Sequence, residues 1–152
     1  MPKKVDQVKL PPHSIEAEQS VLGGLMLDTN AWDKIIDHIF GKDFYRREHQ
    51  LIFQAIQDLI HHQKPLDVLT VAEALKQNNQ LEEIGGEVYL FELAQQTPSA
   101  ANILAYADIV RERSILRQLI EVAQDIANNA FYPKVEAQKF YHQTHDNLFL
   151  AR

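Results

Sequence analysis

The sequence IGGEVYLFELAQQTPSAANILAYADIVRER, from Ile84 to Arg113, decides the fold because it joins a small body to a long helix that no glycine interrupts. All five glycines of the chain lie at or before this junction. A nucleotide-binding P-loop needs glycines so that backbone N–H groups can surround phosphates, and the motif G-x-x-x-x-G-K-[ST] does not occur in the 152 residues. The chain is therefore not predicted to hydrolyse ATP.

The sequence after this junction predicts a helical hairpin over residues 99–152. No helix breaker occurs over residues 99–131, and a helix of that length spans about 50 Å. A shorter apolar repeat beyond Pro133 predicts a second helix over residues 135–150, which we expect to fold back antiparallel to the first. The apolar stripe of the long helix, from Ile115 to Ala127, is too broad for one neighbouring helix to cover. The uncovered part predicts self-association or a partner helix, because monomers rarely expose large apolar patches.

Residues 14–98 are predicted to form a small globular head of about five to six helices, preceded by a flexible leader over residues 1–13. Ser14 has the position of a helix N-cap, and apolar residues recur at helical spacing over the segments that follow. Gly23 and Gly24 inside the first helix predict the close approach of a neighbouring helix. Thr70 and Glu73 have the spacing of a capping box. The predicted fold class is all-α.

The composition argues against several classes of function. Fifteen Lys and Arg against 21 Asp and Glu give a formal charge of −6, which disfavours binding to a phosphate backbone. The chain contains no cysteine, which excludes disulfides and thiolate zinc sites. No apolar run approaches the roughly 20 residues of a membrane helix, and no signal peptide is evident. We expect a cytoplasmic protein that does not enter a membrane.

Several polar groups could form a site, but each has a simpler explanation. His142 and His145, beside Asp146, have a spacing that could offer two imidazoles to a metal, although a solvated helix face explains them better, as it does for His61 and His62. The acidic pairs Glu16 with Glu18 and Glu82 with Glu83 are read as caps and solvated loops rather than acid–base pairs. The cluster Tyr45, Arg46 and Arg47 could stack on and pair with single-stranded DNA, which the net charge disfavours. No catalytic residue, metal site or cofactor site is predicted.

Two rival functions remain open at this stage. Residues Thr70 to Asn78 could belong to a helix-turn-helix DNA-binding domain, which would bind DNA with a steep salt dependence. A small hydrolase that uses the histidines would contain a bound metal. We expect DNA binding to be weak or absent.

Three segments carry a resemblance to a known family: PPHSIEAEQSVLGGLMLD at residues 11–28, DFYRREHQLIFQAI at residues 43–56, and the segment from Ile84 to Arg113. Together they closely resemble the N-terminal domain of the DnaB-type bacterial replicative DNA helicase. The resemblance implies an all-helical head with a hairpin, without the RecA-like motor that would bind ATP and magnesium. It also implies a bacterial, cytoplasmic protein of DNA replication.

The resemblance further implies the partners of the chain. Hairpins of this family pair two protomers, three pairs form the collar of a hexamer, and the collar recruits a DnaG-type primase. A helicase loader is a further possible partner, and a free-standing adaptor that regulates a helicase is an alternative to a helicase fragment. Ile120 and Ile126 match hairpin positions near the primase interface of the family. The candidate partner or dimer interface comprises Ile109, Leu116, Leu119, Ile120, Ala123, Ile126, Phe140 and Tyr141. For each of these the alternative is simple hairpin core.

Three arginines are candidates for a polar part of the same interface, namely Arg111, Arg113 and Arg117. Arginine pairs with a partner carboxylate through two parallel hydrogen bonds, which suits an interface. The alternative is a solvated pair along the helix, such as Arg117 with Glu121.

Overall fold

The computed structural model describes the backbone of residues 9–150 and the side chains as far as residue 146. Every regular element in this range is a helix, which confirms the all-α prediction. The chain separates into two compact units, with the division between Ile115 and Leu116. The first unit includes the head and the start of the long helix. Of the predicted leader, residues 1–8 lie outside the described residues.

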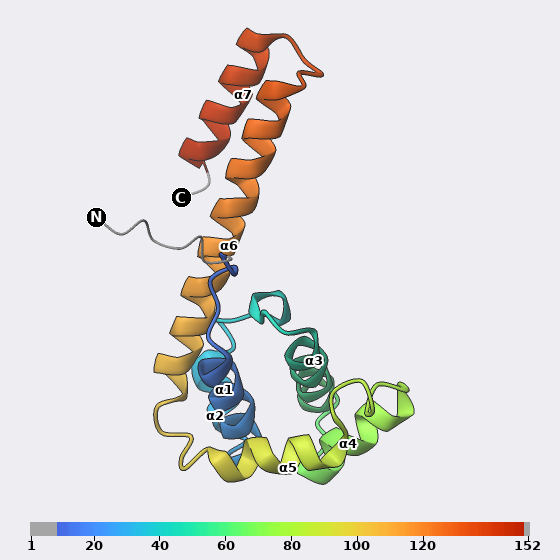
Figure 1. Ribbon diagram of the computed structural model, residues 1–152. Coiled ribbons are helices and arrows are strands. Elements are labelled where there is room, and N and C mark those ends of the chain that lie inside the picture. The colour runs from blue at the N-terminus through green and yellow to red at the C-terminus, as the bar shows by residue number, and fades with distance from the viewer. Residues whose placement is uncertain (1–8, 151–152) are drawn as a thin grey trace, which may run out of the picture. The chain divides into compact units, whose positions relative to one another are not determined.

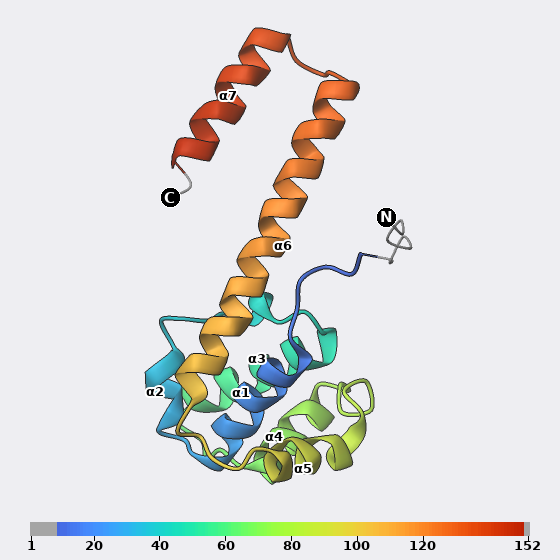
Figure 2. The same ribbon diagram turned by 60° about the vertical axis from the view of Figure 1, so that its left-hand side comes forward.

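Five α-helices and one short 3₁₀ helix build the head (Figures 1 and 2). Their bounds are α1 Ile15–Leu27, α2 Ala31–Ile35, η1 Gly41–Asp43, α3 Arg47–His61, α4 Val68–Gln77 and α5 Gly86–Gln96. Helix α1 packs against α5, α3 and α2, and α4 packs against both α3 and α5. The core side chains are apolar, and the largest fully buried ones include Phe44, Phe53, Leu22, Leu25, Ile52, Ile56, Leu75 and Leu90.

The first helix begins where the sequence predicts. The Ser14 hydroxyl accepts a hydrogen bond from the Ala17 N–H at 3.2 Å, which satisfies one of the free donors of the first turn. Gly23 and Gly24 are both buried, and the backbone of α5 and the side chain of Ile103 lie against them. The predicted close approach at the two glycines is therefore present in the structure.

The predicted capping box of the fourth helix is wrong by one turn. The N-cap is Asp67, whose carboxylate accepts from the Thr70 N–H while the Thr70 hydroxyl accepts from the Asp67 N–H, both at 2.9 Å. Thr70 therefore occupies the third helical position rather than the cap. Asp67 follows Pro65 and Leu66, where the sequence indicates a loop, so the local pattern does not mark it as a helix cap.

The helical spacing of apolar residues from Trp32 to Phe40 predicts a second helix that Gly41 ends, but the observed helix is shorter. Helix α2 ends at Ile35, and Phe40 is extended, with φ −123° and ψ 161°. The Phe40 N–H donates to the Asp43 carboxylate at 2.8 Å, which starts the 3₁₀ helix η1 at Gly41. Gly41 therefore begins a new element instead of ending the predicted helix.

The long helix α6, Ile103–Phe131, begins four residues after the predicted start at residue 99. The Ser99 hydroxyl accepts a hydrogen bond from the Ala101 N–H at 3.0 Å. This local bond between a side chain and the backbone favours a turn over residues 99–102, ahead of the helix. Within the first unit α6 buries one narrow face, made by Ile103, Ala107, Val110 and Ser114. These contacts extend the packed head beyond the predicted boundary at residue 98.

The second unit is a helical hairpin. It consists of α6 from Leu116 onward and α7, Ala137–Leu150, and the two run antiparallel (Figures 1 and 2). The turn includes Pro133, which cannot continue a helix. The structure begins the second helix two residues after the predicted residue 135. Within residues 9–150 no helix combines the length and apolar character needed to cross a bilayer.

Candidate partner interface

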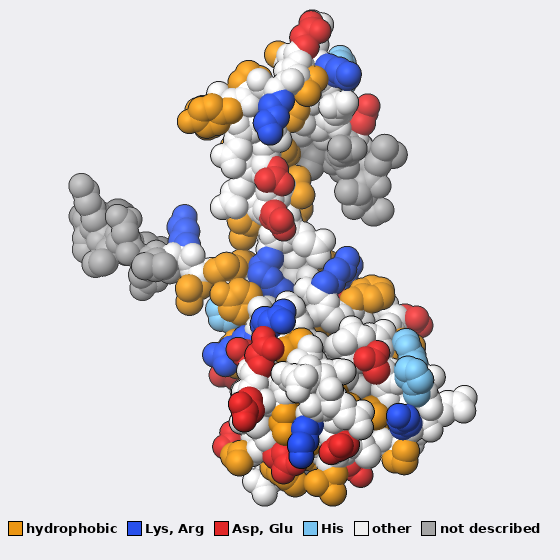
Figure 3. Space-filling model, turned by 90° about the vertical axis from the view of Figure 1, so that its right-hand side faces the viewer, with side chains coloured by type: hydrophobic (Ala, Val, Ile, Leu, Met, Phe, Trp, Pro, Cys, Tyr) orange, Lys and Arg blue, Asp and Glu red, His pale blue; other side chains and the backbone are white. Residues whose placement is uncertain are grey.

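The hairpin exposes the apolar stripe that the sequence singled out. Leu119 is 55% exposed and Ile120 is 44% exposed, although both are large aliphatic residues. Leu116 and Ala123 are also exposed, so the four predicted residues line one face of α6 at helical spacing. Figure 3 shows hydrophobic side chains open to solvent along this unit, between charged ones. A face of this kind in water is typical of a surface that another helix covers.

The remaining predicted interface residues lie in three different settings. Ile126 and Phe140 are half-buried within the hairpin unit, whereas Tyr141 is 65% exposed. Tyr141 stacks on His145, with ring centroids 5.8 Å apart. Ile109 lies in the first unit and packs, partly buried, against the core of the head. These contacts indicate that Ile109 contributes to packing of the head rather than to the hairpin interface.

The three predicted arginines do not form one cluster. The Arg111 guanidinium donates to the Asp43 carboxylate at 2.9 Å, so it holds α6 to the head. Arg113 lies 3.6 Å from its neighbour Glu112, both close to solvent. Arg117 is half-buried in the second unit. Of the three, Arg111 has a clear intramolecular role.

A buried carboxylate fixes the point where α6 leaves the head. Asp43 is fully buried, and the same oxygen that binds Arg111 also accepts from the Ser114 hydroxyl at 2.7 Å. Its other oxygen accepts from the Phe40 N–H. Ser114 is the last buried residue of α6, so these bonds anchor the final turn that packs on the head. No local pattern in the sequence singles out Asp43, because Arg111 and Ser114 are 68 and 71 residues away.

A second buried polar cluster joins three helices of the head. Glu18 and His49 have almost no exposed surface, and His49 Nδ1 lies 2.8 Å from Glu18 Oε1. The Glu18 carboxylate also accepts from the backbone N–H groups of Tyr45 and Arg46, at 2.8 and 3.4 Å. On the other side, His49 Nε2 lies 2.6 Å from the Tyr89 hydroxyl. Because a carboxylate only accepts, His49 Nδ1 carries a proton and donates to Glu18.

The prediction that Glu18 is a solvated residue at the start of a helix is wrong, because its side chain is buried, and no sequence prediction involved His49. A signal for both was present in the periodicity. His49 precedes Ile52, Phe53 and Ile56 by three, four and seven residues, so it falls on the apolar face of α3. Glu18 falls on the apolar face of α1 in the same way, ahead of Val21, Leu22 and Leu25.

Comparison with known proteins identifies the family of the chain. The profile of the family described as DnaB-like helicase N terminal domain matches residues 10–112, which is more than half of the sequence. The chain belongs to the DnaB-like helicase N-terminal domain family. The resemblance carried by the three sequence segments is thereby confirmed.

Relatives of this DnaB-like domain include a replicative DNA helicase DnaB of Haemophilus influenzae. It is 51% identical over 132 residues, which cover 87% of this chain and 28% of the relative. The chain therefore spans little more than a quarter of the length of that helicase. The solved N-terminal domain of DnaB helicase from Mycobacterium tuberculosis has a TM-score of 0.87 and 34% identity, covering 92% of this chain and 99% of that one. The N-terminal domain of DnaB helicase from Helicobacter pylori has the same fold, with a TM-score of 0.66, 24% identity, and 76% and 89% coverage.

In this DnaB-like domain the histidines that suggested a metal do not converge on other ligands. Within residues 9–150 no group of three His, Asp or Glu side chains is placed to hold a metal ion. His142 packs edge-on against Tyr141, and His62 Nδ1 lies 2.7 Å from the Asp58 carbonyl oxygen. These contacts are those of side chains on a helix surface.

The Tyr89 hydroxyl of the DnaB-like domain gives a testable pH dependence. Burial raises the pKa of Tyr89 above its usual value of 10.0. Because the pKa of Tyr89 is higher in the folded state than in the unfolded state, keeping its hydroxyl protonated stabilises the fold. This stabilisation is complete below pH 10 and is lost as the pH rises through the folded-state pKa. We expect the loss of stability above pH 10 to be shallower in Tyr89→Phe than in the wild type. Urea unfolding at a series of alkaline pH values, followed by the fluorescence of Trp32, measures it. Equal slopes in the two proteins would contradict the assignment.

Proposed function

We propose that this chain is an assembly and docking domain of a replicative helicase, which pairs with a second copy through its hairpin and recruits primase. The observation that carries the proposal is the exposed stripe of Leu116, Leu119, Ile120 and Ala123, with Tyr141 on the second helix. Burying such a face against a second copy would contribute roughly 25 cal/mol for each Å² of apolar surface removed from water.

The comparisons support the part of the proposal that concerns primase recruitment by a replicative helicase. The Helicobacter pylori N-terminal domain, which shares this fold, was solved with a study of its interactions with primase. The whole relatives are replicative DNA helicases, of which this chain matches about 28% of the length. Three hairpin pairs in a collar above a motor, and a helicase loader as a further partner, are part of the same proposal. So is a cytoplasmic location in a bacterium. ATP and magnesium would act in the motor, and we assign no catalytic step to the residues described here.

The helix-turn-helix alternative has little support in the head. The exposed surface of α4, of the turn after it and of the start of α5 carries Glu73, Glu82 and Glu87 with one lysine, Lys76. A surface with this excess of carboxylates repels the phosphate backbone that such a domain must contact. A free-standing adaptor would use the same hairpin stripe, so it differs from the main proposal only in the protein to which it is joined.

Replacing Leu119 and Ile120 together by aspartate is expected to abolish pairing of the chain. Both side chains are exposed in the single copy, so the double variant keeps its helix content, whereas two charges would be buried in a paired face. We expect the dissociation constant of the pair to rise at least about 100-fold. Sedimentation equilibrium over a wide concentration range, with circular dichroism for folding, measures this change.

The matched control is Asn128→Asp, which adds a charge to an exposed position on the polar side of the same helix. This variant should pair as the wild type does. A wild-type chain that sediments as a monomer at every concentration would remove hairpin pairing from the proposal. Docking is tested separately, by calorimetric titration with the helicase-binding domain of the cognate primase. Absence of heat at concentrations well above micromolar would remove primase recruitment.

A further inference from the structure

Helix α5 presents an apolar stripe with acidic borders to solvent, on the head and separate from the hairpin. Val88 is 69% exposed and Phe91 is 44% exposed, and they are three residues apart. Glu87 and Glu92, also exposed, lie on the same side of the helix because they are four residues before Phe91 and four after Val88. We call Glu87, Val88, Phe91 and Glu92 the α5 face.

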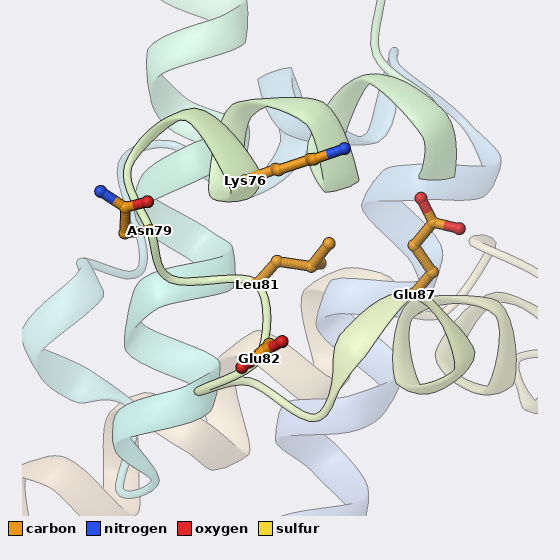
Figure 4. A pocket seen from close by; sticks show the side chains of 5 residues that line it. All are labelled: Lys76, Asn79, Leu81, Glu82 and Glu87. Atoms are coloured by element: carbon orange, nitrogen blue, oxygen red, sulfur yellow. The ribbon is translucent and has the colours of Figure 1, made fainter.

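A hollow adjoins the start of this face. It has a volume of about 430 Å³ and is lined by Lys76 of α4, by Asn79, Leu81 and Glu82 in the turn that follows α4, and by Glu87 of the α5 face. Figure 4 shows Leu81 between Lys76 and Glu82, with the side chains of Leu81 and Lys76 extending toward Glu87. The hollow therefore combines an apolar surface with two carboxylates, at a size that accommodates a long side chain.

The carboxylates around the hollow are not neutralised by the described part of the chain. Among residues 9–150, Glu83 forms an ion pair with Arg47 at 2.7 Å, but Glu82, Glu87 and Glu92 form none. In the part of the chain that the structure describes, Lys76 is the one cation that lines the hollow, and it forms no ion pair with either of the two glutamates there. Two negative charges against one positive charge leave the hollow with an excess of negative charge.

We propose that the α5 face and its hollow dock a basic segment of a partner protein. A lysine or arginine of the segment would lay its aliphatic stem on Leu81 and place its charge near Glu82 and Glu87. Apolar side chains that follow it would cover Val88 and Phe91. Charge complementarity selects this chemistry, since the same carboxylates repel nucleic acid and anionic lipid. This site is independent of hairpin pairing and of primase recruitment.

The probe for the site is a short synthetic peptide of leucine and lysine at helical spacing, with a glutamate-for-lysine version as its control. Both are titrated into the full chain carrying Leu119→Asp and Ile120→Asp, so that the hairpin stripe cannot take up the peptide. Backbone amide shifts in ¹⁵N spectra locate the binding. We expect shifts centred on Glu82, Glu87, Val88 and Phe91 with the lysine peptide, and none with the glutamate peptide.

Substitutions then separate this site from a general attraction of charges. Glu82→Gln with Glu87→Gln should weaken binding about tenfold, and Val88→Ser should weaken it several-fold. Lys76→Gln removes the competing cation and should tighten binding about threefold, which a merely structural lysine would not do. The matched controls are Asp33→Asn, which changes an exposed acid on α2, and Ile36→Ser, which changes the exposed apolar residue that caps α2. Both should leave affinity unchanged.

Three outcomes would overturn the proposal. The first is the absence of shifts on the α5 face at millimolar peptide. The second is that deleting residues 2–8 shifts the same amides without peptide, which would make the occupant the chain's own leader. The third is that these amides shift with protein concentration alone, which would make it a second copy.

Discussion

Gly23→Ala is expected to lower the free energy of unfolding of the head by about 2 to 3 kcal/mol. A Cβ atom on Gly23 would overlap the backbone carbonyl oxygen of Leu93 and the Thr97 hydroxyl. Thr97 Oγ1 already donates to that carbonyl at 3.0 Å, and both groups belong to the end of α5, so neither can move without shifting the helix. The gain of about 1 kcal/mol from replacing glycine by alanine in a helix is smaller than this cost.

The adjacent glycine supplies the matched control. A Cβ on Gly24 would meet Ile103 Cδ1 at 3.1 Å, and this atom is the end of a side chain that can rotate. Gly24→Ala should therefore change the free energy of unfolding by less than about 1 kcal/mol. Urea unfolding followed by the fluorescence of Trp32, the single and buried tryptophan, reports on both variants. Equal stabilities of the two variants would show that α5 does not press on α1 at Gly23.

Local patterns in the sequence predicted the elements but not the partners of their polar side chains. The apolar spacing of α3 and the glycine pair of α1 each involve residues a few positions apart, and both predictions agree with the structure. Ser114 and Asp43 are 71 residues apart, and Glu18 and Tyr45 are 27 residues apart. No periodicity within one helix connects such pairs. The sequence prediction therefore assigned Glu18 to solvent and assigned no role to Asp43.

The candidate interface was predictable to the extent that it depends on one helix face. The exposed residues Leu116, Leu119 and Ile120 follow from the width of the stripe, since one hairpin partner cannot cover them. Ile109 and Arg111 lie on the same helix, but there α6 is still packed on the head. The helical repeat continues unchanged from one environment to the other. Only the tertiary structure shows that the change occurs near Ser114 and Ile115.

Glu18→Ala is expected to lower the free energy of unfolding by about 3 to 5 kcal/mol, the largest effect predicted for this chain. The buried Glu18 carboxylate accepts from two backbone N–H groups and from His49. Removing the carboxylate leaves all three donors inside the head with no acceptor and opens a cavity. The expected loss is therefore well above that of an ordinary surface substitution.

The control is Glu16→Ala, in the same first turn of α1 but exposed, which should cost less than about 1 kcal/mol through the helix dipole alone. Glu18→Gln separates charge from shape, since the amide keeps one acceptor but presents an N–H group to donors that need an oxygen. We expect its loss to lie between those of the other two variants. Urea unfolding at one fixed chain concentration compares all three, because any pairing makes stability depend on concentration. If Glu18→Ala were as mild as Glu16→Ala, the junction of α1, α3 and α5 would have to depend on apolar packing alone, and the buried Glu18–His49 pair would contribute nothing to it.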